Sequence, residues 1–454
     1  MSTNSASPGP PKIFPLLKTP ATAIESQSSL LRGLRNLISS GVRSRLGLTC
    51  RFCRSRIIVF KGKHENMKTA RIQTTVFLGI VALTAGFLAT AGPAQKTDWK
   101  GKVLTEDGVR VVVNPAEPIY GKIKLDLGEE LRIGKEGDER TQFYRVRDIA
   151  ADPRGNIYVD DMSNGRIQVF DPHGAFLRSI GRPGQGPGEF DYPTLIRFGG
   201  RDGRLHVMDR FQRINLFDGQ GFYVRSIVPE RGFVDYFPDA ADGFVAVMRT
   251  SSDEELTSFH ALSRIDASGK SRAVLAEFPY TIHMERRAGG TLAVSTGYEL
   301  SLYAAPLPGS AIVYGCSEDY ELVILGPDDR KALVIRKDER RPEFTSKEKT
   351  GFGKIPLPKL KPYFFGILTD PEGRIYVQRN MNTGGKRGYG PIATEDKLFD
   401  VFSGEGRFLF RTALPPNTRV IRGDLVYTFY VDEEQGLEYA QRFRIKNYAA
   451  LPKN

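Results

Sequence analysis

Cysteine, histidine and tryptophan are scarce in this chain. Its 454 residues include three cysteines, five histidines and one tryptophan. Cys50 and Cys53 stand near the N-terminus, so Cys316 is the single cysteine after residue 95, and no disulfide can form within that part of the chain. The pair Cys50/Cys53 has no second pair to complete a zinc site and lacks the strand–helix context of a redox motif.

Several sequence signatures of catalysis are also missing. The sequence contains no phosphate-binding loop, no HExxH motif and no serine-nucleophile motif. A catalytic zinc ion needs three protein ligands, typically imidazoles. The histidines after residue 95 are His173, His206, His260 and His283. We predict no cofactor, although a calcium site built from Asp160, Asp161 and Asp209 stays open, because oxygen ligands need no fixed spacing.

Positive charge is concentrated at the start of the chain. The formal net charge is +12, but residues 1–66 contain 11 basic residues against 2 acidic ones, and residues 95–454 contain 52 against 51. The nearly neutral remainder lacks the basic surface of a nucleic-acid-binding protein, so we expect no nucleic acid as a partner.

Residues 67–94 have the features of a secretory signal peptide. Lys68 and Arg71 give a basic start, an apolar core covers about residues 76–88, and Ala-Thr-Ala at 89–91 offers a cleavage site. The alternative is an uncleaved membrane anchor, because the apolar run approaches the roughly 18 residues of a membrane span. We predict an extracytoplasmic protein, periplasmic or secreted, that contacts a membrane only if this segment is retained.

Residues 1–66 precede this signal and are rich in serine, proline and arginine. Such a composition supports little packing. We expect a disordered basic extension, or a stretch upstream of the true start at Met67. Residues 95–454 are then the folded part.

Four short runs of alternating apolar residues between 146 and 180 predict consecutive antiparallel strands. Asp-Pro-X-Gly turns at 152–155 and 171–174 place proline where φ is fixed and glycine where φ must be positive. Gly203 and Gly221 follow the two turn glycines by 48 and 47 residues. Strands repeated at such a period indicate a propeller.

The segment 370–377 repeats 152–159 almost residue for residue, which implies that the sequence between them also forms blades. We place six blades at 144–182, 193–228, 233–276, 280–337, 363–415 and 418–446. The long start of the fourth leaves seven blades as an alternative. The last blade lacks a fourth strand, so a strand between Val109 and Leu127 is predicted to complete it and close the ring, which removes two exposed edges.

Three segments of the first repeat resemble the NHL repeat. They are Gly-Asn-Ile-Tyr-Val at 155–159, Arg-Ile-Gln-Val-Phe at 166–170 and Gly-Gln-Gly-Pro-Gly-Glu-Phe at 184–190. The resemblance to bacterial proteins of that group implies an all-β, six-bladed NHL-like propeller. Such propellers also resemble the zinc-dependent lyase domain of peptide-amidating enzymes and, more distantly, calcium-dependent lactonases.

Loop lengths predict a binding surface at one end of the propeller. The turns after the first and third strands are short, whereas the long connections 250–259, 337–362 and 380–396 belong to the other end, where binding usually resides. Aligning the second strands by their preceding glycine places four charged residues there. They are Asp161, Asp209, Arg249 and Arg379. We predict that they orient a polar ligand, the alternative being ordinary surface ion pairs.

These observations favour an exported scaffold that binds an unidentified protein or small ligand on its loop-bearing face without catalysis. The alternative is a metal-dependent lyase or hydrolase that uses calcium or zinc at the central channel. The enzyme needs at least three His, Asp or Glu side chains around one point, which the binding scaffold does not.

Overall fold

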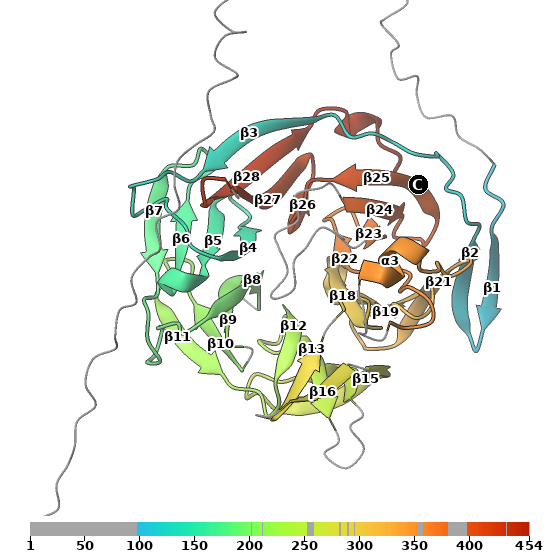
Figure 1. Cartoon of the computed structure of the whole chain (residues 1–454), viewed down its shortest axis with the longest axis horizontal. Coiled ribbons are helices and arrows are strands. Elements are labelled where there is room, and N and C mark those ends of the chain that lie inside the picture. The colour runs from blue at the N-terminus through green and yellow to red at the C-terminus, as the bar shows by residue number, and fades with distance from the viewer. Residues whose placement is uncertain are drawn as a thin grey trace, which may run out of the picture. The chain divides into compact units, whose positions relative to one another are not determined.

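The computed structural model describes residues 98–453 except 201, 211, 252–257, 281–282, 288–289, 295, 352–356, 380–396 and 433. The predicted signal peptide and basic extension lie outside the described residues. Leu88–Asn454 forms one compact unit. Within it, six β-sheets surround a central axis, which is the predicted six-bladed β-propeller (Figure 1).

The first three blades are four-stranded sheets whose strands follow one another from the axis outward. Blade 1 contains β4 (Val146–Ala151), β5 (Ile157–Asp161), β6 (Arg166–Phe170) and β7 (Phe176–Ile180). Blade 2 contains β8 (Pro193–Gly199), β9 (Arg204–Asp209), β10 (Arg213–Phe217) and β11 (Tyr223–Ile227). Blade 3 contains β12 (Phe233–Pro238), β13 (Phe244–Ser251), β14 (Ser258–Ile265) and β15 (Ser271–Tyr280).

The next two blades are extended by the N-terminal segment. Blade 4 contains β18 (Leu302–Leu307), β19 (Ala311–Cys316), β20 (Glu321–Leu325) and β21 (Lys331–Lys337), followed by β2 (Val109–Asn114) and β1 (Lys102–Glu106). Blade 5 contains β22 (Ile367–Thr369), β23 (Ile375–Gln378), β24 (Lys397–Phe402) and β25 (Phe408–Leu414). Strand β2 runs parallel to β21, and residues 119–123 hydrogen-bond along the outer strand β25.

Blade 6 is completed by the N-terminal segment. It contains β26 (Val420–Arg422), β27 (Leu425–Asp432) and β28 (Leu437–Ile445), with β3 (Leu127–Ile133) antiparallel to β28. Closure by an N-terminal strand is confirmed, but this strand begins where the predicted range ends, and Val109–Asn114 pairs with blade 4 instead. The segment follows the outside of blades 4, 5 and 6 in turn, so only its last strand, which leads directly into blade 1, reaches blade 6.

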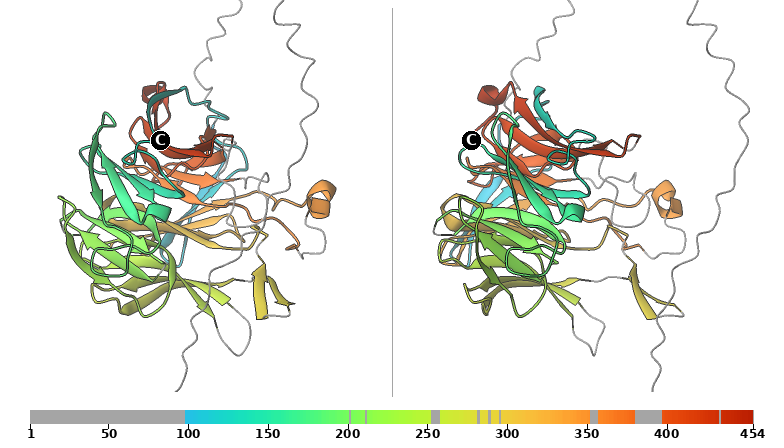
Figure 2. Two further views of the ribbon diagram at one scale, coloured as in Figure 1. Left: turned by 60° about the vertical axis from the view of Figure 1, so that its left-hand side comes forward. Right: turned by 90° about the vertical axis from the view of Figure 1, so that its left-hand side faces the viewer.

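Two protruding elements separate the later blades. Strands β16 (His283–Arg287) and β17 (Gly290–Val294) form their own hairpin between blades 3 and 4, so blade 4 begins at Leu302 and not near 280. Helix α3 (Ser346–Gly351) lies between blades 4 and 5. Figure 2 shows both projecting beyond the blades on the same side. Among the described residues, no helix is long and apolar enough to cross a membrane.

The opposite face of the propeller consists of tight turns. Gly155 and Gly174 have φ of +85° and donate their N–H groups to the carbonyls of Asp152 and Asp171 at 2.9 and 3.0 Å. Oδ1 of Asp152 also accepts hydrogen bonds from two backbone N–H groups of its own turn. We call this the turn face, and the end that carries the connections 134–145, 181–192, 281–301 and 338–366 the loop-rich face.

Short 3₁₀ turns occur at Met162–Asn164, Pro308–Ser310 and Tyr448–Ala450.

The apolar core lies between neighbouring blades. Ile157 and Val159 of blade 1 pack in one cluster with Phe429 of blade 6. Tyr158 and Val169, on the other side of blade 1, pack in a cluster with residues of blade 2. Each blade therefore buries both faces, and burying one such side chain contributes about 1.5–3 kcal/mol. The blades form a rigid support for the groups at their ends.

Candidate functional site

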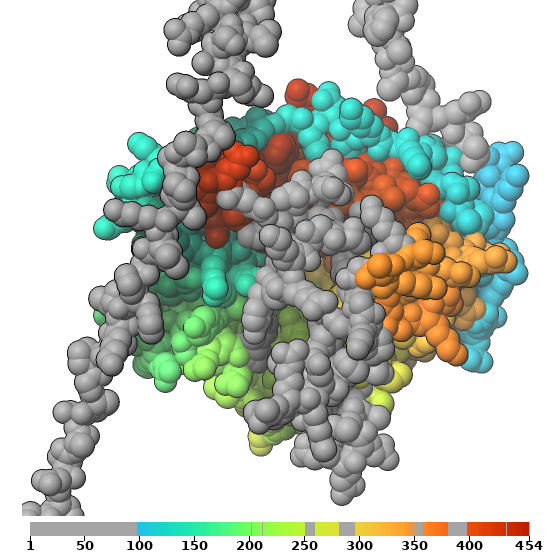
Figure 3. Space-filling view, viewed as in Figure 1, coloured from blue at the N-terminus to red at the C-terminus, as the bar shows by residue number. Residues whose placement is uncertain are grey.

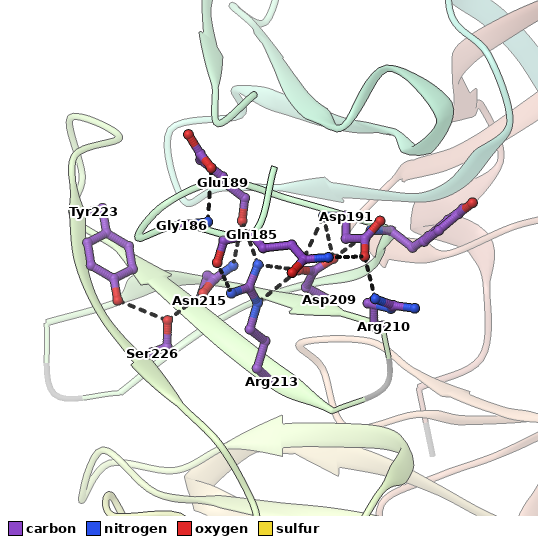
Figure 4. Close-up of polar contacts among 11 residues, drawn as sticks. Gln185, Gly186, Glu189, Asp191, Asp209, Arg210, Arg213, Asn215, Tyr223 and Ser226 are labelled. Atoms are coloured by element: carbon purple, nitrogen blue, oxygen red, sulfur yellow. Dashed lines mark hydrogen bonds and ion pairs between the residues drawn. The ribbon is translucent and has the colours of Figure 1, made fainter. Parts of the chain in front are cut away.

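Asp209 attaches the connection between blades 1 and 2 to the loop-rich end of blade 2 (Figure 4). The carboxylate is completely buried, and its Oδ2 lies 2.7 Å from Nη2 of Arg213. Its Oδ1 accepts a hydrogen bond from the backbone N–H of Tyr192 at 2.7 Å. Arg213 donates to the carbonyls of Gln185 and Glu189 at 2.9 and 3.0 Å. The ion pair therefore acts as a latch on this connection.

Asp161 repeats the arrangement in blade 1. It is also completely buried, with Oδ2 2.8 Å from Nε of Arg166. It accepts the backbone N–H of Tyr144 at 2.8 Å, and Arg166 donates to the carbonyl of Glu139 at 2.7 Å. In blades 1 and 2, therefore, an aspartate that ends the second strand and an arginine that begins the third hold the connection that leads into the blade.

Arg379 takes the equivalent position in blade 5 and belongs to a buried charged network. Its guanidinium lies 2.6 Å from Glu339 and 3.3 Å from Asp400. Asp400 also pairs with Lys337 and Arg411, each at 2.7 Å. Burial by itself would raise the pKa of Asp400, but these three cations hold it below its ordinary value.

Arg249 faces a different way from the other three residues. Phe244 pairs with Ile265, so Met248 takes the position that Asp161 has in blade 1. Arg249 is exposed, and its guanidinium lies 4.8 Å from the centre of the Tyr280 ring. The glycine alignment fails here because Gly243 is one residue closer to the first paired residue. No described contact joins the four predicted ligand-binding residues to one another.

An ion-pair chain along the channel was not predicted from the sequence. Arg197 on β8 bridges Asp148 on β4 and Asp235 on β12 at 2.8 and 3.0 Å. Nε of Arg419, directly before β26, lies 3.5 Å from the second oxygen of Asp148. This series of ion pairs links blades 6, 1, 2 and 3 in order. In the sequence, these residues share one feature, which is that each lies in or beside the first strand of a repeat. That strand is the innermost strand of its blade.

Known proteins match parts of this fold. A family model described as a 6-bladed beta-propeller matches residues 138–231. This match agrees with the six sheets around one axis. The chain is a six-bladed β-propeller. The matches do not single out the NHL repeat.

One curated relative shares part of the propeller. Peptidyl-glycine alpha-amidating monooxygenase A of Xenopus laevis is 31% identical over 141 residues, which are 28% of this chain and 15% of that protein. The chain thus spans a small part of this relative.

Two solved bacterial proteins resemble the propeller as a whole. One, from Bacteroides fragilis and provisionally described as exported, is 12% identical, with 74% of this chain and 99% of that one covered and a TM-score of 0.44. The other, from Bacteroides vulgatus, is 14% identical, with 71% and 98% covered and a TM-score of 0.42.

Asp160 lies beside the ion-pair chain of this propeller and has no hydrogen-bond partner among the described groups. It is completely buried, and burial together with the charge of Asp148 raises its pKa well above the ordinary value. Of the three carboxylates in the possible calcium set, Asp161 pairs with Arg166 and Asp209 pairs with Arg213. In the described ranges, no three His, Cys, Asp or Glu side chains are grouped so as to hold a metal ion.

The described histidines of the propeller are dispersed. His206 is completely buried inside β9, and burial and Arg225 lower its pKa to about 4. Burial and Arg249 lower the pKa of His260 to about 4, and its ring stacks on Tyr280. His173 is exposed in a turn on the turn face.

Proposed function

We propose that this propeller is an exported binding protein that recognises a protein or small ligand with its loop-rich face. The observation that carries the proposal is a pair of tyrosines at equivalent positions. Tyr144 and Tyr192 are 49% and 48% exposed, while their backbone N–H groups are bound to Asp161 and Asp209. Half-exposed tyrosines on a fixed backbone suit binding, because little conformational entropy is lost on contact.

The shape of this end of the propeller supports the same proposal. The projecting helix α3 stands on the face displayed in Figure 3, on the side where the β16–β17 hairpin also projects. The turn face has tight turns instead. A rigid scaffold with long connections at one end is a common arrangement for recognition.

A metal-dependent lyase or hydrolase is the second hypothesis from the sequence. It requires three ligands around one point, and the part of the chain that the structure describes contains no such group. In the binding proposal, Asp161 and Asp209 position the binding face through their bonds to the backbone N–H groups of Tyr144 and Tyr192.

A photo-crosslinking experiment tests which face binds. The full chain carries p-benzoylphenylalanine in place of Tyr144 or Tyr192, and in place of Phe222 as the control, since Phe222 is 67% exposed beside a turn-face turn. In the native host, we expect a discrete adduct from the first two positions and none from Phe222. Equal adducts at all three positions, or an adduct from Phe222 alone, would contradict the proposal.

Export has its own test. We expect mass spectrometry of the protein from cells to show an N-terminus directly after Ala91. Intact protein in the membrane fraction would support the anchor instead, and intact protein in the cytoplasm would refute export.

A further inference from the structure

Arg374 is a buried arginine at the turn face of blade 5, directly before β23. Its side chain is 2% exposed. Nη1 donates to Oδ2 of Asp370 at 3.2 Å and to the hydroxyl oxygen of Tyr448 at 3.3 Å. Nε and Nη2 are also buried, and they have no hydrogen-bond partner among the described groups. Because buried donors are rarely left unpaired, this edge of the guanidinium indicates an acceptor that the folded chain does not supply.

The equivalent position of blade 1 is occupied by a shorter side chain. Asn156 donates its backbone N–H to Oδ1 of Asp152 at 2.9 Å and its side-chain amide to Oδ2 at 2.8 Å. Arg374 forms the same two kinds of bond with Asp370. Since its side chain is longer, two further N–H donors remain beyond the aspartate. Blade 5 therefore has the same turn as blade 1, with donors that the turn itself does not use.

Arg374 lines a cavity of about 310 Å³. The cavity lies between the turns 370–373 and 403–406 of blade 5 and the C-terminal segment. The two turns lie against each other, because a Cβ atom on Gly404 would be 3.3 Å from the carbonyl oxygen of Gly373. The lining contains two acids, two bases and one tyrosine, and consists of Glu372, Arg374, Gly404, Glu405, Tyr448 and Lys453. A cavity of this volume suits a small molecule.

The charged groups of this cavity have both signs. Glu372, Glu405 and Lys453 are exposed, and none of them forms an ion pair with another described residue. Glu372 and Glu405 take the same place in their turns, directly before the turn glycine, where blade 1 has Arg154 and His173. The turn therefore does not require an acid at this place. A simple anion would lie beside two acids here and a simple cation beside two bases, so a ligand with both charges fits best.

We propose that this cavity binds a small molecule that carries both a carboxylate and an ammonium group, such as a free amino acid. The carboxylate accepts two parallel hydrogen bonds from Nε and Nη2 of Arg374, and Lys453 adds a positive charge. The ammonium group donates to the carboxylates of Glu372 and Glu405. The Tyr448 ring, whose centre lies 5.2 Å from the guanidinium carbon, shifts to admit the ligand. The site lies on the turn face, so the inference goes beyond the proposed function and does not depend on it.

Calorimetric titration of the purified full chain tests the class of ligand. L-leucine and, separately, γ-aminobutyrate are titrated at constant ionic strength, with acetate and methylammonium as probes that carry a single charge. We expect at least one of the two zwitterions to bind, about tenfold or more tightly than either single-charge probe. Absence of binding by both zwitterions, or equally tight binding of a single-charge probe, would overturn the proposal.

Substitution of exposed residues tests where the zwitterion binds. Glu405→Gln removes a partner of the ammonium group, and Lys453→Met removes a charge beside the carboxylate. The matched controls are Asp328→Asn and Arg330→Gln, because these side chains are 60% and 87% exposed in a turn of the turn face in blade 4. We expect about tenfold weaker binding in the first two variants and unchanged binding in the controls. Equal weakening in all four variants would contradict the site.

A measurement on the wild type does not depend on the folding of a variant. We expect saturation with the bound zwitterion to slow hydrogen exchange in the turns 370–373 and 403–406. The turns 152–155 and 171–174 of blade 1 are the internal control, and their exchange should stay unchanged. Equal protection in the two blades, or protection of the loop-rich face alone, would show that the zwitterion binds elsewhere.

Discussion

Nζ of Lys337 lies 2.7 Å from Oδ2 of Asp400, and both side chains are completely buried. Lys337 ends β21, the fourth strand of blade 4, whereas Asp400 lies in the third strand of blade 5, so the pair crosses a boundary between blades. In blades 1 and 2 the position of Asp400 is occupied by Gln168 and Asn215, which hydrogen-bond to serines on the next strand. In blade 5, Arg411 takes the place of these serines and pairs with Asp400. One position of the repeat thus changes from a neutral pair to a charged network.

The first prediction concerns Asp400. We expect Asp400→Asn to lower the free energy of unfolding by about 3–5 kcal/mol at neutral pH, because buried cations lose their counter-charge. The folded-state pKa of Asp400 is below its ordinary value, so its contribution is present above that ordinary value and is lost as the pH falls through the folded-state pKa. Urea unfolding across the acid range measures both effects.

The control for this variant is Asp328→Asn. Its partner Arg330 lies 3.7 Å away, and both side chains are largely exposed, so we expect a change below about 1 kcal/mol. Equal effects in the two variants would show that the buried network adds no specific stability.

Asp160 is predicted to act in the opposite sense. Its pKa is raised in the folded state, so its favourable contribution is present below the unfolded pKa and is lost as the pH rises through the folded-state pKa. We expect Asp160→Asn to be more stable than the wild type at neutral pH by about 1 kcal/mol, with a flatter dependence of stability on pH. Urea unfolding between acid and neutral pH checks this.

Its neighbour supplies the control, because Asp161→Asn removes the counter-charge of Arg166 and should destabilise the protein. If both variants were destabilised at neutral pH, burial of an ionised Asp160 would not be costly.

The latch of blade 2 leads to a third prediction. We expect Asp209→Asn to increase hydrogen exchange in residues 184–192, because Arg213, which donates to two carbonyls of this connection, loses its buried counter-charge. The expected cost in global stability is about 1–3 kcal/mol. Arg210→Gln is the matched control, because its pair with Asp191 is half-exposed and lies in the same region. Exchange that rises equally in both variants would refute the latch.

Asn114 provides a fourth prediction. Its buried side chain donates to the carbonyl of Gly406 and accepts the backbone N–H of Phe408, both at 2.8 Å, which binds the N-terminal segment to blade 5. We expect Asn114→Ala to cost about 2–4 kcal/mol, since two buried backbone groups lose their partner. Thermal unfolding measures it, with Asn447→Ala as the control because the bonds of Asn447 are exposed. A similar loss of stability in both variants would show that the buried bonds of Asn114 contribute no more than the exposed bonds of Asn447.

The fold was largely predictable because its signals are local. The turns at 152–155 and 171–174 contain both the aspartate that caps the turn and the glycine that needs positive φ, and the strands between them alternate in the expected way. Arg249 was aligned one residue away from the position of Asp161 because the turn before its strand is one residue shorter. Counting residues from Gly243 does not reveal this difference. The extra hairpin β16–β17 was assigned to blade 4 because short strands in this region fit the period of the repeat.

The site was less predictable because its contacts are remote in sequence. Asp148 meets Arg197 from the next blade and Arg419 from the far end of the chain, and no periodicity identifies such partners. Asp161 and Asp209 were correctly placed at the loop-rich ends of their strands, but the arginines and backbone N–H groups that enclose them were not predicted. The ligand role of Asp161, Asp209, Arg249 and Arg379 stays a prediction, and the connection 380–396 lies outside the described residues.

The path of the N-terminal segment has a consequence for biogenesis. Leu127 pairs with Ile445, and Arg110 with Leu333, so the earliest strands emerge from the ribosome hundreds of residues before their partners. Until then the second edge of β2 and both edges of β3 lack their partners, and open strand edges are prone to association with other chains. The ring can close only after synthesis is nearly finished. Maturation of this protein should therefore be slow and sensitive to holding chaperones.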